Sequence, residues 1–396
     1  MGRTLSTFIS NLQTKAQDPN LTAATAVIYL NDAILDVKAD YRIRSAIRRE
    51  TIKIYKDVNE YPLPIPSGAT ETDFESICDL TEWFEGTASA SRFNRVTPSR
   101  FARKMDVGYQ DNYITPFIRN GQNMLLVDYD PGTSNVTVEA CDDLTTNGSW
   151  AASGDANNLT ADDQTYLEGG GALNFDITPS TLTATLTNST LAAVDLTDYE
   201  NNASLFLYAY LPSATNITSL ALRWGSDSSN YWSKTVTTQH NGLAFQDGWN
   251  LLSFDWNAAT KTASPTVSAI NYLQVNMVMN SSQAADTDFR IDGIVARQSK
   301  DMYFLYDSSS WVKTSAGAVK NAFIATDDTY EFVGTETEAA LVEIKALQLI
   351  YVYEIVDDLK AANSEKRYQE MLRNLKSRNP EISKNQSFIY TKIGFL

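Results

Sequence analysis

DGWNLLSFDW, at residues 247–256, is the stretch from which the fold of this chain can be worked out. It reads as a polar turn followed by a strand in which apolar and polar residues alternate, the pattern of a half-buried β-strand. Two further stretches, ASLFLYAYLP at 203–212 and YLQVNMVM at 272–279, alternate in the same way. Because these strands have apolar residues on both faces and are separated by polar turns, they predict an all-β, two-sheet sandwich over residues 133–298.

Both flanks of this segment predict helices instead. LTAATAVIYLNDAILDVKADY, at 21–41, has Thr22 as a candidate N-cap before apolar residues at helical spacing. TETEAALVEIKALQLIYVYEIVDDL, at 335–359, begins with the capping box Thr335-x-x-Glu338 and continues as a long apolar stripe. Short alternating stretches between the first helices and the sandwich indicate a small β extension.

The two flanks are expected to form one domain. If residues 133–298 are removed, MLLVDYDP (124–131) is followed almost directly by KDMYFLYD (300–307), and these two strands would form a hairpin. Exposed turns tolerate inserted domains because few contacts are made there. We therefore predict a multidomain α+β protein, in which residues 1–132 and 299–396 form a discontinuous helical-bundle domain and the sandwich is inserted into it.

Charge and composition exclude several classes of protein. The chain has 396 residues and a net charge of −16, and residues 131–298 hold 17 acidic and five basic side chains. Nonspecific nucleic-acid binding depends on neutralising phosphates, so it is disfavoured for the chain and excluded for this segment. No apolar run approaches the roughly 20 residues of a membrane-spanning helix, so no membrane insertion is expected. The first residues do not read as a signal peptide and the two cysteines indicate no disulfide framework, so synthesis in a reducing cytoplasm is expected.

The residues also give little basis for catalysis, and we expect no enzymatic activity. His240 is the only histidine of the chain, so a Ser-His-Asp relay or a His-based zinc site has almost nothing to build from. The glycines at 169–171 lack the Lys-Ser/Thr of a phosphate loop. Two carboxylates could make a glycosidase, but acidic pairs such as Asp162 and Asp163 lie on polar turns, where solvated side chains are the common case.

The two flanks contain a series of features in a fixed order. AVIYLNDAILDV (26–37) is followed by the YPLP turn (Tyr61–Pro64) and by YITPFIRNGQNMLLVDYDP (113–131). After the sandwich come the acidic turn ATDDTYEF (325–332) and the helix EAALVEIKALQLIYVYEI (338–355). In this order the flanks, about 230 residues, resemble the head-to-tail adaptor (head-completion or neck-ring) proteins of tailed bacteriophages.

The adaptor resemblance implies a location and a set of partners. Proteins of this kind form a homo-oligomeric ring of about twelve subunits in the virion neck, between the portal protein and a tail or gatekeeper protein. They act as a connector and as a DNA-ejection conduit, through which double-stranded DNA passes without specific binding. The host would be a bacterium, in whose cytoplasm the protein is made. We expect the apolar C-terminal tail to insert into the portal or a neighbouring subunit, or alternatively to fold back on its own core; its candidate contacts are Phe388, Ile389, Tyr390, Ile393 and Phe395.

The sandwich segment resembles a different family. VTVEACDD (136–143), the Gly-Trp-Asn turn at 248–250 and FRIDGIVAR (289–297) are similar to stretches of the jelly-roll carbohydrate-binding modules of bacterial glycan-degrading enzymes. The resemblance implies a structural calcium ion held by the last-strand acid Asp292 together with an acid near the first strand, Glu139 or Asp142. The alternative is that these are ordinary exposed acids, and no other cofactor is expected.

Aromatic side chains in the sandwich are candidates for a sugar platform. Sugars stack their apolar C–H faces on exposed rings, and LRWGSDSSNYWSKT (222–235) supplies Trp224, Tyr231 and Trp232. Trp249 and Trp256 are expected to anchor the sandwich, because DGWN reads as a turn leading into a core strand. Core packing is the alternative for each of the three platform candidates.

Together these observations predict a structural virion protein of the phage neck, whose sandwich projects outward and binds a host-surface glycan. Many weak sites in one ring would then bind with avidity. The alternative is a tail or baseplate protein whose main task is glycan adhesion. A third hypothesis is a cytoplasmic glycan enzyme with helical arms.

Overall fold

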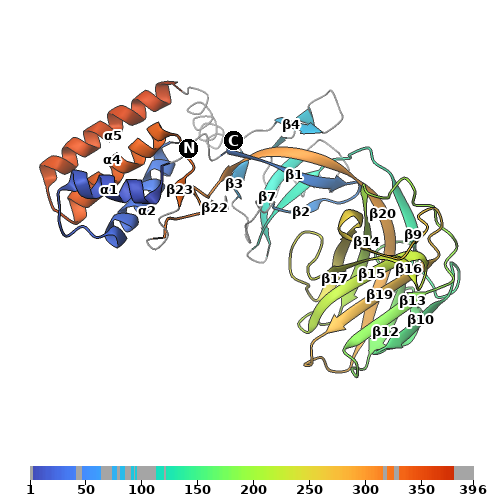
Figure 1. The fold of residues 1–396 in the computed structure, drawn as a ribbon. Coiled ribbons are helices and arrows are strands. Elements are labelled where there is room, and N and C mark those ends of the chain that lie inside the picture. The colour runs from blue at the N-terminus through green and yellow to red at the C-terminus, as the bar shows by residue number, and fades with distance from the viewer. Residues whose placement is uncertain are drawn as a thin grey trace. The chain divides into compact units, whose positions relative to one another are not determined.

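The chain folds into two compact units, which are described separately below. The first unit consists of Met1–Glu50, Pro64–Asp79 and Tyr303–Leu396, and the second of Thr51–Leu63 and Leu80–Met302. Two strands labelled in Figure 1, β1 (Ile47–Tyr55) and β20 (Asp286–Ser308), have residues in both units. The computed structural model describes residues 3–41, 47–63, 74–77, 81–84, 91–92, 94–95, 113–119, 122–314, 319–324 and 330–378.

The first unit is built around helices from both ends of the chain (Figure 1). Their buried residues form one hydrophobic core, in which Phe8, Leu30, Leu341 and Tyr368 come from four different helices. The two ends of the chain therefore fold against each other. In the part of the chain that the structure describes, no helix is long and apolar enough to cross a membrane. The helices are α1 (Leu5–Ala16), α2 (Ala23–Asp40), α4 (Glu336–Tyr353) and α5 (Asp358–Arg378).

Threonine caps and one buried carboxylate set the positions of these helices. At the start of α4, Thr335 and Glu338 form the predicted capping box, with Thr335 N donating to Glu338 Oε2 at 2.7 Å. Glu343, buried on α4, binds the side chains of Arg3 and Lys15. Since one partner precedes α1 and the other lies on it, this ion pair joins the N-terminal segment to the C-terminal helices.

Short strands complete the first unit. Three of them form a small antiparallel sheet in the order β22-β21-β23, and the end of β20 pairs with β3. Their bounds are β3 (Phe74–Ile77), β21 (Val312–Lys313), β22 (Val319–Lys320) and β23 (Glu331–Phe332).

The second unit contains a small sheet of its own, in the order β2-β8-β7-β6. Here β8 pairs with β2 and β7, whereas the described end of β20 pairs with β3. The predicted hairpin between 124–131 and 300–307 is therefore wrong, although both stretches do contain strands. The bounds are β2 (Glu60–Pro62), β6 (Asn94–Arg95), β7 (Tyr113–Arg119) and β8 (Gln122–Asp128), with a further pair, β4 (Thr81–Phe84) and β5 (Ser91–Arg92).

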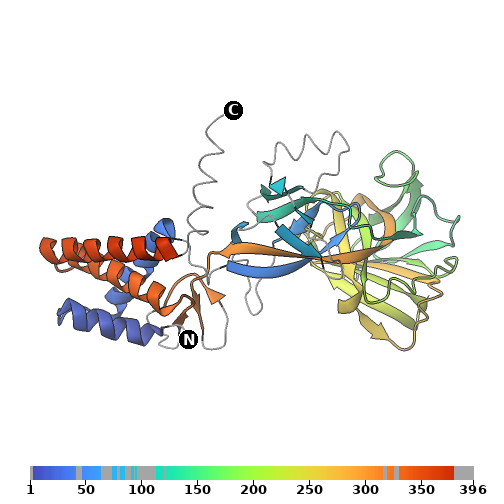
Figure 2. The same ribbon diagram turned by 90° about the horizontal axis from the view of Figure 1, so that it is seen from above.

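The rest of the second unit is the predicted β-sandwich of two antiparallel sheets (Figures 1 and 2). The first sheet has the order β11-β12-β20-β14-β17, with β9 also paired to β20, and the second has the order β10-β13-β19-β15-β16-β18. The first sheet comprises β9 (Asn135–Glu139), β11 (Ala156–Asp162), β12 (Ala172–Ile177), β14 (Ala203–Leu211) and β17 (Gly248–Asp255) besides β20. The second comprises β10 (Trp150–Gly154), β13 (Thr183–Asn188), β15 (Ile217–Asp227), β16 (Asn230–Val236), β18 (Thr260–Thr262) and β19 (Tyr272–Met279).

A bulge in β20 keeps this long strand in register with the core. Before the bulge Phe289 and Ile291 face the core, and after it Ile294 and Ala296 do so. Gly293 lies between them with φ +55°, a left-handed conformation that favours glycine. The extra residue shifts the alternation by one, so that apolar side chains stay inside along the whole strand.

The compact units differ from the predicted domains on both sides of the sandwich. The prediction grouped residues 1–132 with residues 299–396, whereas Leu80–Met302 and Thr51–Leu63, which we call the arm, both belong to the unit that contains the sandwich. The hydroxyls of Tyr55 and Ser204 lie 2.8 Å apart, and Arg297 Nη1 donates to the carbonyl oxygen of Lys56 at 2.9 Å. These contacts explain why the arm packs on the sandwich.

Candidate functional site

Aromatic side chains lie on the outer face of the first sheet, the face turned away from the sandwich core. In β14 Leu207 and Ala209 are buried in the core, whereas Tyr208 and Tyr210 are half-buried on the opposite side. In β17 Trp249 likewise alternates with core residues and is half-buried. Strand alternation thus places rings from two adjacent strands on one outer face.

Backbone pairing aligns one of these aromatic pairs with polar side chains across the whole sheet. Tyr210 is paired with Trp249 on one neighbouring strand and with Arg290 on the other. Asn174 is paired with Arg290, and Thr160 with Asn174. We call these five residues the central row. Because neighbouring strands lie about 4.8 Å apart, the central row extends over roughly 19 Å.

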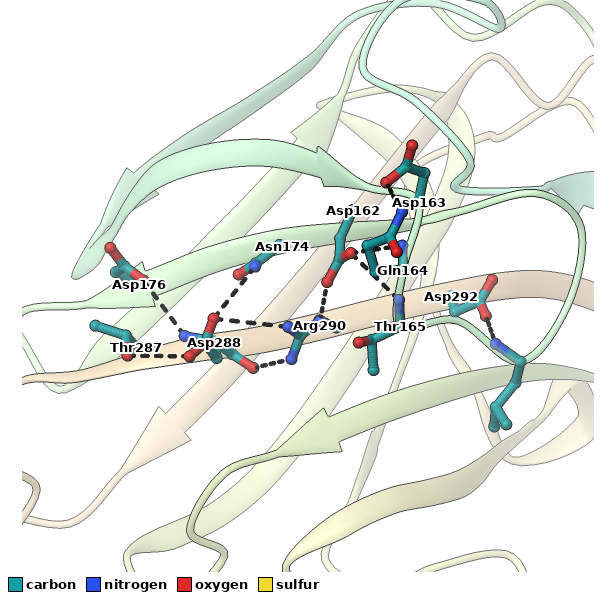
Figure 3. A network of polar contacts seen from close by, with 11 residues as sticks. Asp162, Asp163, Gln164, Thr165, Asn174, Asp176, Thr287, Asp288, Arg290 and Asp292 are labelled. Atoms are coloured by element: carbon teal, nitrogen blue, oxygen red, sulfur yellow. Dashed lines mark hydrogen bonds and ion pairs between the residues drawn. The ribbon is translucent and has the colours of Figure 1, made fainter.

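Arg290 is the charged centre of the row, and it is held in place from several sides. Its Nε donates to Asp162 Oδ2 at 2.6 Å, and its Nη1 donates to the carbonyl oxygen of Asp288 at 2.9 Å (Figure 3). The guanidinium carbon lies 5.1 Å from the ring centre of Tyr210. That ring meets the Trp249 ring edge to face, with centroids 5.4 Å apart. The row therefore presents a fixed cation beside a fixed aromatic pair.

A second set of polar side chains borders the row on the same face. Asp176 accepts from Asn158 Nδ2 at 2.8 Å and from the backbone N–H of Asp288 at 3.3 Å. The side chain of Asp288 is 61% exposed and accepts from Asn174 Nδ2 at 3.5 Å (Figure 3). Carboxylate and amide groups are thus available next to the aromatic pair.

The loop of residues 163–171, which we call the bracing loop, joins β11 to β12 and begins beside Arg290. The Oδ1 atom of Asp162 accepts from the N–H groups of Gln164 at 2.8 Å and Thr165 at 3.2 Å. The Gln164 amide, together with Arg290 on the other carboxylate oxygen, holds the pKa of Asp162 below its ordinary value. One carboxylate therefore fixes both the loop and the arginine.

Asp292 and Asp142, two of the predicted calcium ligands, hold the remainder of the same loop. Each carboxylate accepts two consecutive backbone N–H groups, so six loop amides are bound by three aspartates. The distances are 2.6 and 3.0 Å from Leu167 N and Glu168 N to Asp292 Oδ2, and 2.9 and 3.2 Å from Gly170 N and Gly171 N to Asp142 Oδ1.

Glu139, the third predicted calcium ligand, accepts from the N–H of Cys141 at 3.2 Å. Burial raises the pKa of both Glu139 and Asp292. Across the described residues, no three His, Cys, Asp or Glu side chains form a group that could hold a metal ion. Glu139 Oε2 and Asp292 Oδ1 are buried and accept no hydrogen bond from the described residues, so the calcium site predicted at Glu139, Asp142 and Asp292 stays a prediction.

The predicted sugar platform is also corrected by the structure. Trp224 is fully buried and Trp232 is 3% exposed, and both rings pack edge to face against Trp256 in the sandwich core. Neither ring can stack on a sugar in this conformation. Tyr231 is half-buried on the second sheet, where the guanidinium carbon of Arg223 lies 4.8 Å from its ring centre. The structure therefore does not bring the three residues together as a platform.

Trp249 is the tryptophan that the sequence interpretation missed. It was expected to anchor the core with Trp256, but only Trp256 is buried there. The sequence contains a partial signal for this difference, since Trp249 shares its strand phase with Leu251 but also with the polar residues Ser253 and Asp255. A residue in phase with polar neighbours points to the outer face.

The opposite end of the outer face is covered by the arm. Phe206, on the outer side of β14, is 1% exposed, and its ring lies 4.9 Å from Tyr55 and 5.0 Å from His240. The ring of Tyr61 also contacts His240, at 5.4 Å. Outside the covered end, the central row has Trp249, Tyr210 and Asn174 half-buried, Thr160 exposed, and Arg290 buried between them at 9% exposure. The predicted tail contacts Phe388, Ile389, Tyr390, Ile393 and Phe395 lie outside the described residues.

Comparison with known proteins finds no matching protein-family model and no matching curated protein. Among solved structures, a family 30 carbohydrate-binding module is similar at 13% identity and a TM-score of 0.29, over 43% of this chain and 98% of the module. A family 22 carbohydrate-binding module from Clostridium thermocellum is similar at 17% identity and a TM-score of 0.24, over 41% of this chain and 94% of the module.

A further solved structure comes from work on the promiscuous specificity of carbohydrate-binding modules of the β-sandwich superfamily. It is similar at 13% identity and a TM-score of 0.29, over 62% of this chain and 96% of that one. These three structures are carbohydrate-binding modules of low identity, and each is similar to only part of this chain.

Proposed function

We propose that the second unit binds a glycan on the outer face of the first sheet. The observation that carries this proposal is the central row, in which Trp249 and Tyr210 are followed by the polar side chains Arg290, Asn174 and Thr160. Sugars offer both apolar C–H faces and hydroxyl groups, so a surface that recognises them needs rings and hydrogen-bonding groups side by side.

The geometry favours binding over catalysis. Arg290 is 9% exposed and is held by Asp162 and by the backbone of Asp288, so the small part of its guanidinium that reaches the surface is already ordered before a ligand binds. The carboxylates of Asp162 and Asp288 could serve as an acid–base pair, but both are paired with Arg290, at 2.6 and 3.6 Å. We therefore propose a binding surface and no catalytic step.

The charge of the face favours a neutral glycan. Asp162, Asp176 and Asp288 lie around Arg290, and Asp288 is exposed. An anionic polysaccharide would meet like charges at short range, and this repulsion weakens as salt is added. A neutral polysaccharide does not meet this electrostatic repulsion.

The test is a calorimetric titration of the intact chain with a panel of neutral and anionic polysaccharides. Trp249→Ala should weaken binding of a neutral ligand at least about tenfold, which corresponds to about 1.4 kcal/mol. Tyr231→Ala is the matched control, because it removes a half-buried ring from the other sheet, and it should leave affinity within about twofold. Loss of binding in Tyr231→Ala with normal binding in Trp249→Ala would contradict the proposal.

The second candidate function is the one implied by the adaptor resemblance, a ring in the virion neck that contacts portal and tail proteins. The comparisons give it no support, and the observation that favours it is the common core of the N- and C-terminal helices. In a ring, several copies of a weak glycan site would bind with avidity. Mass photometry of the purified chain should then show a discrete assembly of about twelve copies. A monomer at micromolar concentration would contradict this function and leave the glycan proposal standing.

A further inference from the structure

The bracing loop is fixed far more firmly than an ordinary surface loop. Three carboxylates bind six of its nine backbone N–H groups: Asp162 binds residues 164 and 165, Asp292 binds 167 and 168, and Asp142 binds 170 and 171. Hydrogen bonds to a charged acceptor are about twice as strong as neutral ones. The loop is therefore held in a single conformation before any ligand arrives.

These bonds also fix where the loop lies. The N–H of Thr165 is bonded to Asp162, which binds Arg290, and the N–H of Leu167 is bonded to Asp292 (Figure 3). Arg290 and Asp292 are two residues apart on the outer side of β20, a distance of about 7 Å. The backbone of the residue between the two bonded amides is consequently held above the outer face of β20.

That residue is Tyr166, and its side chain is left open. It is 41% exposed, and the following Leu167 is 48% exposed, although the loop around them is tightly bonded. An exposed ring on a rigid loop has lost little conformational freedom when it makes a contact, which is the property expected of a recognition residue.

We propose that the bracing loop is the specificity element of the glycan-binding face and that Tyr166 contacts the ligand beyond the Trp249–Tyr210 pair. The inference rests on the proposed function and assigns the position of one further sugar. The loop lies over β20, which is two strands, or about 10 Å across the sheet, from the strand β17 that carries Trp249. A disaccharide on Trp249 and Tyr210 stops short of Tyr166, whereas a longer chain that follows the central row reaches it.

The test compares ligand lengths in the intact chain. With a series of neutral oligosaccharides of one linkage, Tyr166→Ala should weaken tetrasaccharide binding about five- to tenfold and leave disaccharide binding within about twofold. Tyr166→Phe should restore tetrasaccharide affinity if the ring provides the contact. Tyr353→Ala, which removes a 68% exposed tyrosine from the helical unit, is the matched control and should change neither affinity nor melting temperature.

The outcomes separate the two proposals. If Tyr166→Ala binds the tetrasaccharide and the disaccharide as the unmodified chain does, while Trp249→Ala abolishes binding, the role of Tyr166 is overturned. The proposal that the outer face binds glycan would then still stand. If Tyr166→Ala weakens disaccharide and tetrasaccharide binding equally and also lowers the melting temperature, the role of Tyr166 is overturned as well. The substitution would then weaken binding by destabilising the protein. Absence of binding by the unmodified chain to every glycan tested would overturn both proposals.

Discussion

At the scale of single residues, His240 has the most unusual environment of the second unit. Its ring lies between Tyr55, Tyr61 and Phe206, at centroid distances of 5.7, 5.4 and 5.0 Å, and both ring nitrogens are buried without a hydrogen bond. Burial, together with the nearby charge of Arg297, lowers the pKa of His240 to about 3. A histidine that stays neutral here holds the arm on the sandwich by ring packing alone.

This environment makes stability depend on pH. In the unfolded chain His240 takes up a proton near pH 6.5, whereas in the folded chain it does so only near pH 3. The unfolded state therefore binds more protons between these values, and the stabilisation present above pH 6.5 is lost as the pH falls. We predict that the free energy of unfolding of the second unit drops by about 2 kcal/mol from this residue between pH 7 and pH 5.

Urea denaturation at the two pH values measures this effect, with His240→Phe as the control. The variant keeps an aromatic ring in the cage but cannot be protonated, so its pH dependence should be smaller by about the same 2 kcal/mol. Identical pH dependence in both proteins would mean that His240 is solvated in the native state.

The tryptophans show how far single residues could be placed from the sequence. Strand alternation correctly identified which stretches are strands, but it gives only the phase of a side chain and does not say which phase is the core. Trp224 shares its phase with Leu220 and Leu222, which are buried. Trp249 shares its phase with Leu251, Ser253 and Asp255, none of which is buried, so its ring lies on the outer face.

At the scale of elements, the bracing loop depends on glycines that have different tasks. Gly169 has φ +67°, and a Cβ there would lie 2.2 Å from Asp142 Oδ1. Gly170 follows directly and would meet nothing within 4 Å. At Gly169 and Gly171, where a Cβ would meet Asp142 atoms, the absence of a side chain lets the backbone approach Asp142 closely.

Because the two glycines have different surroundings, substituting each with alanine should change the free energy of unfolding by different amounts. Gly169→Ala combines a disfavoured φ with a steric conflict at Asp142, so it should lower the free energy of unfolding by about 1–3 kcal/mol. Gly170→Ala should stay within about 0.5 kcal/mol of the unmodified chain. Thermal denaturation of both variants measures this, and equal destabilisation would show that the loop is not held as described.

Strand β20 explains why the predicted hairpin between residues 124–131 and 300–307 was wrong. The sequence was divided at residue 298, yet β20 continues from Asp286 to Ser308 through the bulge at Gly293. Nothing in the local pattern indicates that one strand serves both units. In the structure β20 pairs with β9, β12 and β14 of the sandwich, and also with β1, β3 and β4. Pairing partners of this kind are set by tertiary structure and not by propensity.

At the scale of the whole molecule, the chain consists of a helical unit and a sandwich unit with different surfaces. Helix signals and the capping box were sufficient to predict that both ends of the chain are helical, and the common core shows that they fold together. The sandwich unit carries the face proposed to bind glycan, and among the described residues the helical unit carries most of the large exposed apolar side chains, including Tyr353, Val356 and Leu359. A binding unit and an assembly unit in one chain fit the two proposed functions.

The most direct test of the glycan-binding face is a crystal structure of the intact chain with a neutral oligosaccharide that binds in solution. The predicted result is a sugar ring stacked on Trp249 or Tyr210, with hydroxyl groups bonded to Arg290 and Asn174 and the chain running towards Tyr166. A ligand bound on the second sheet around Tyr231, or on the helical unit, would contradict the account.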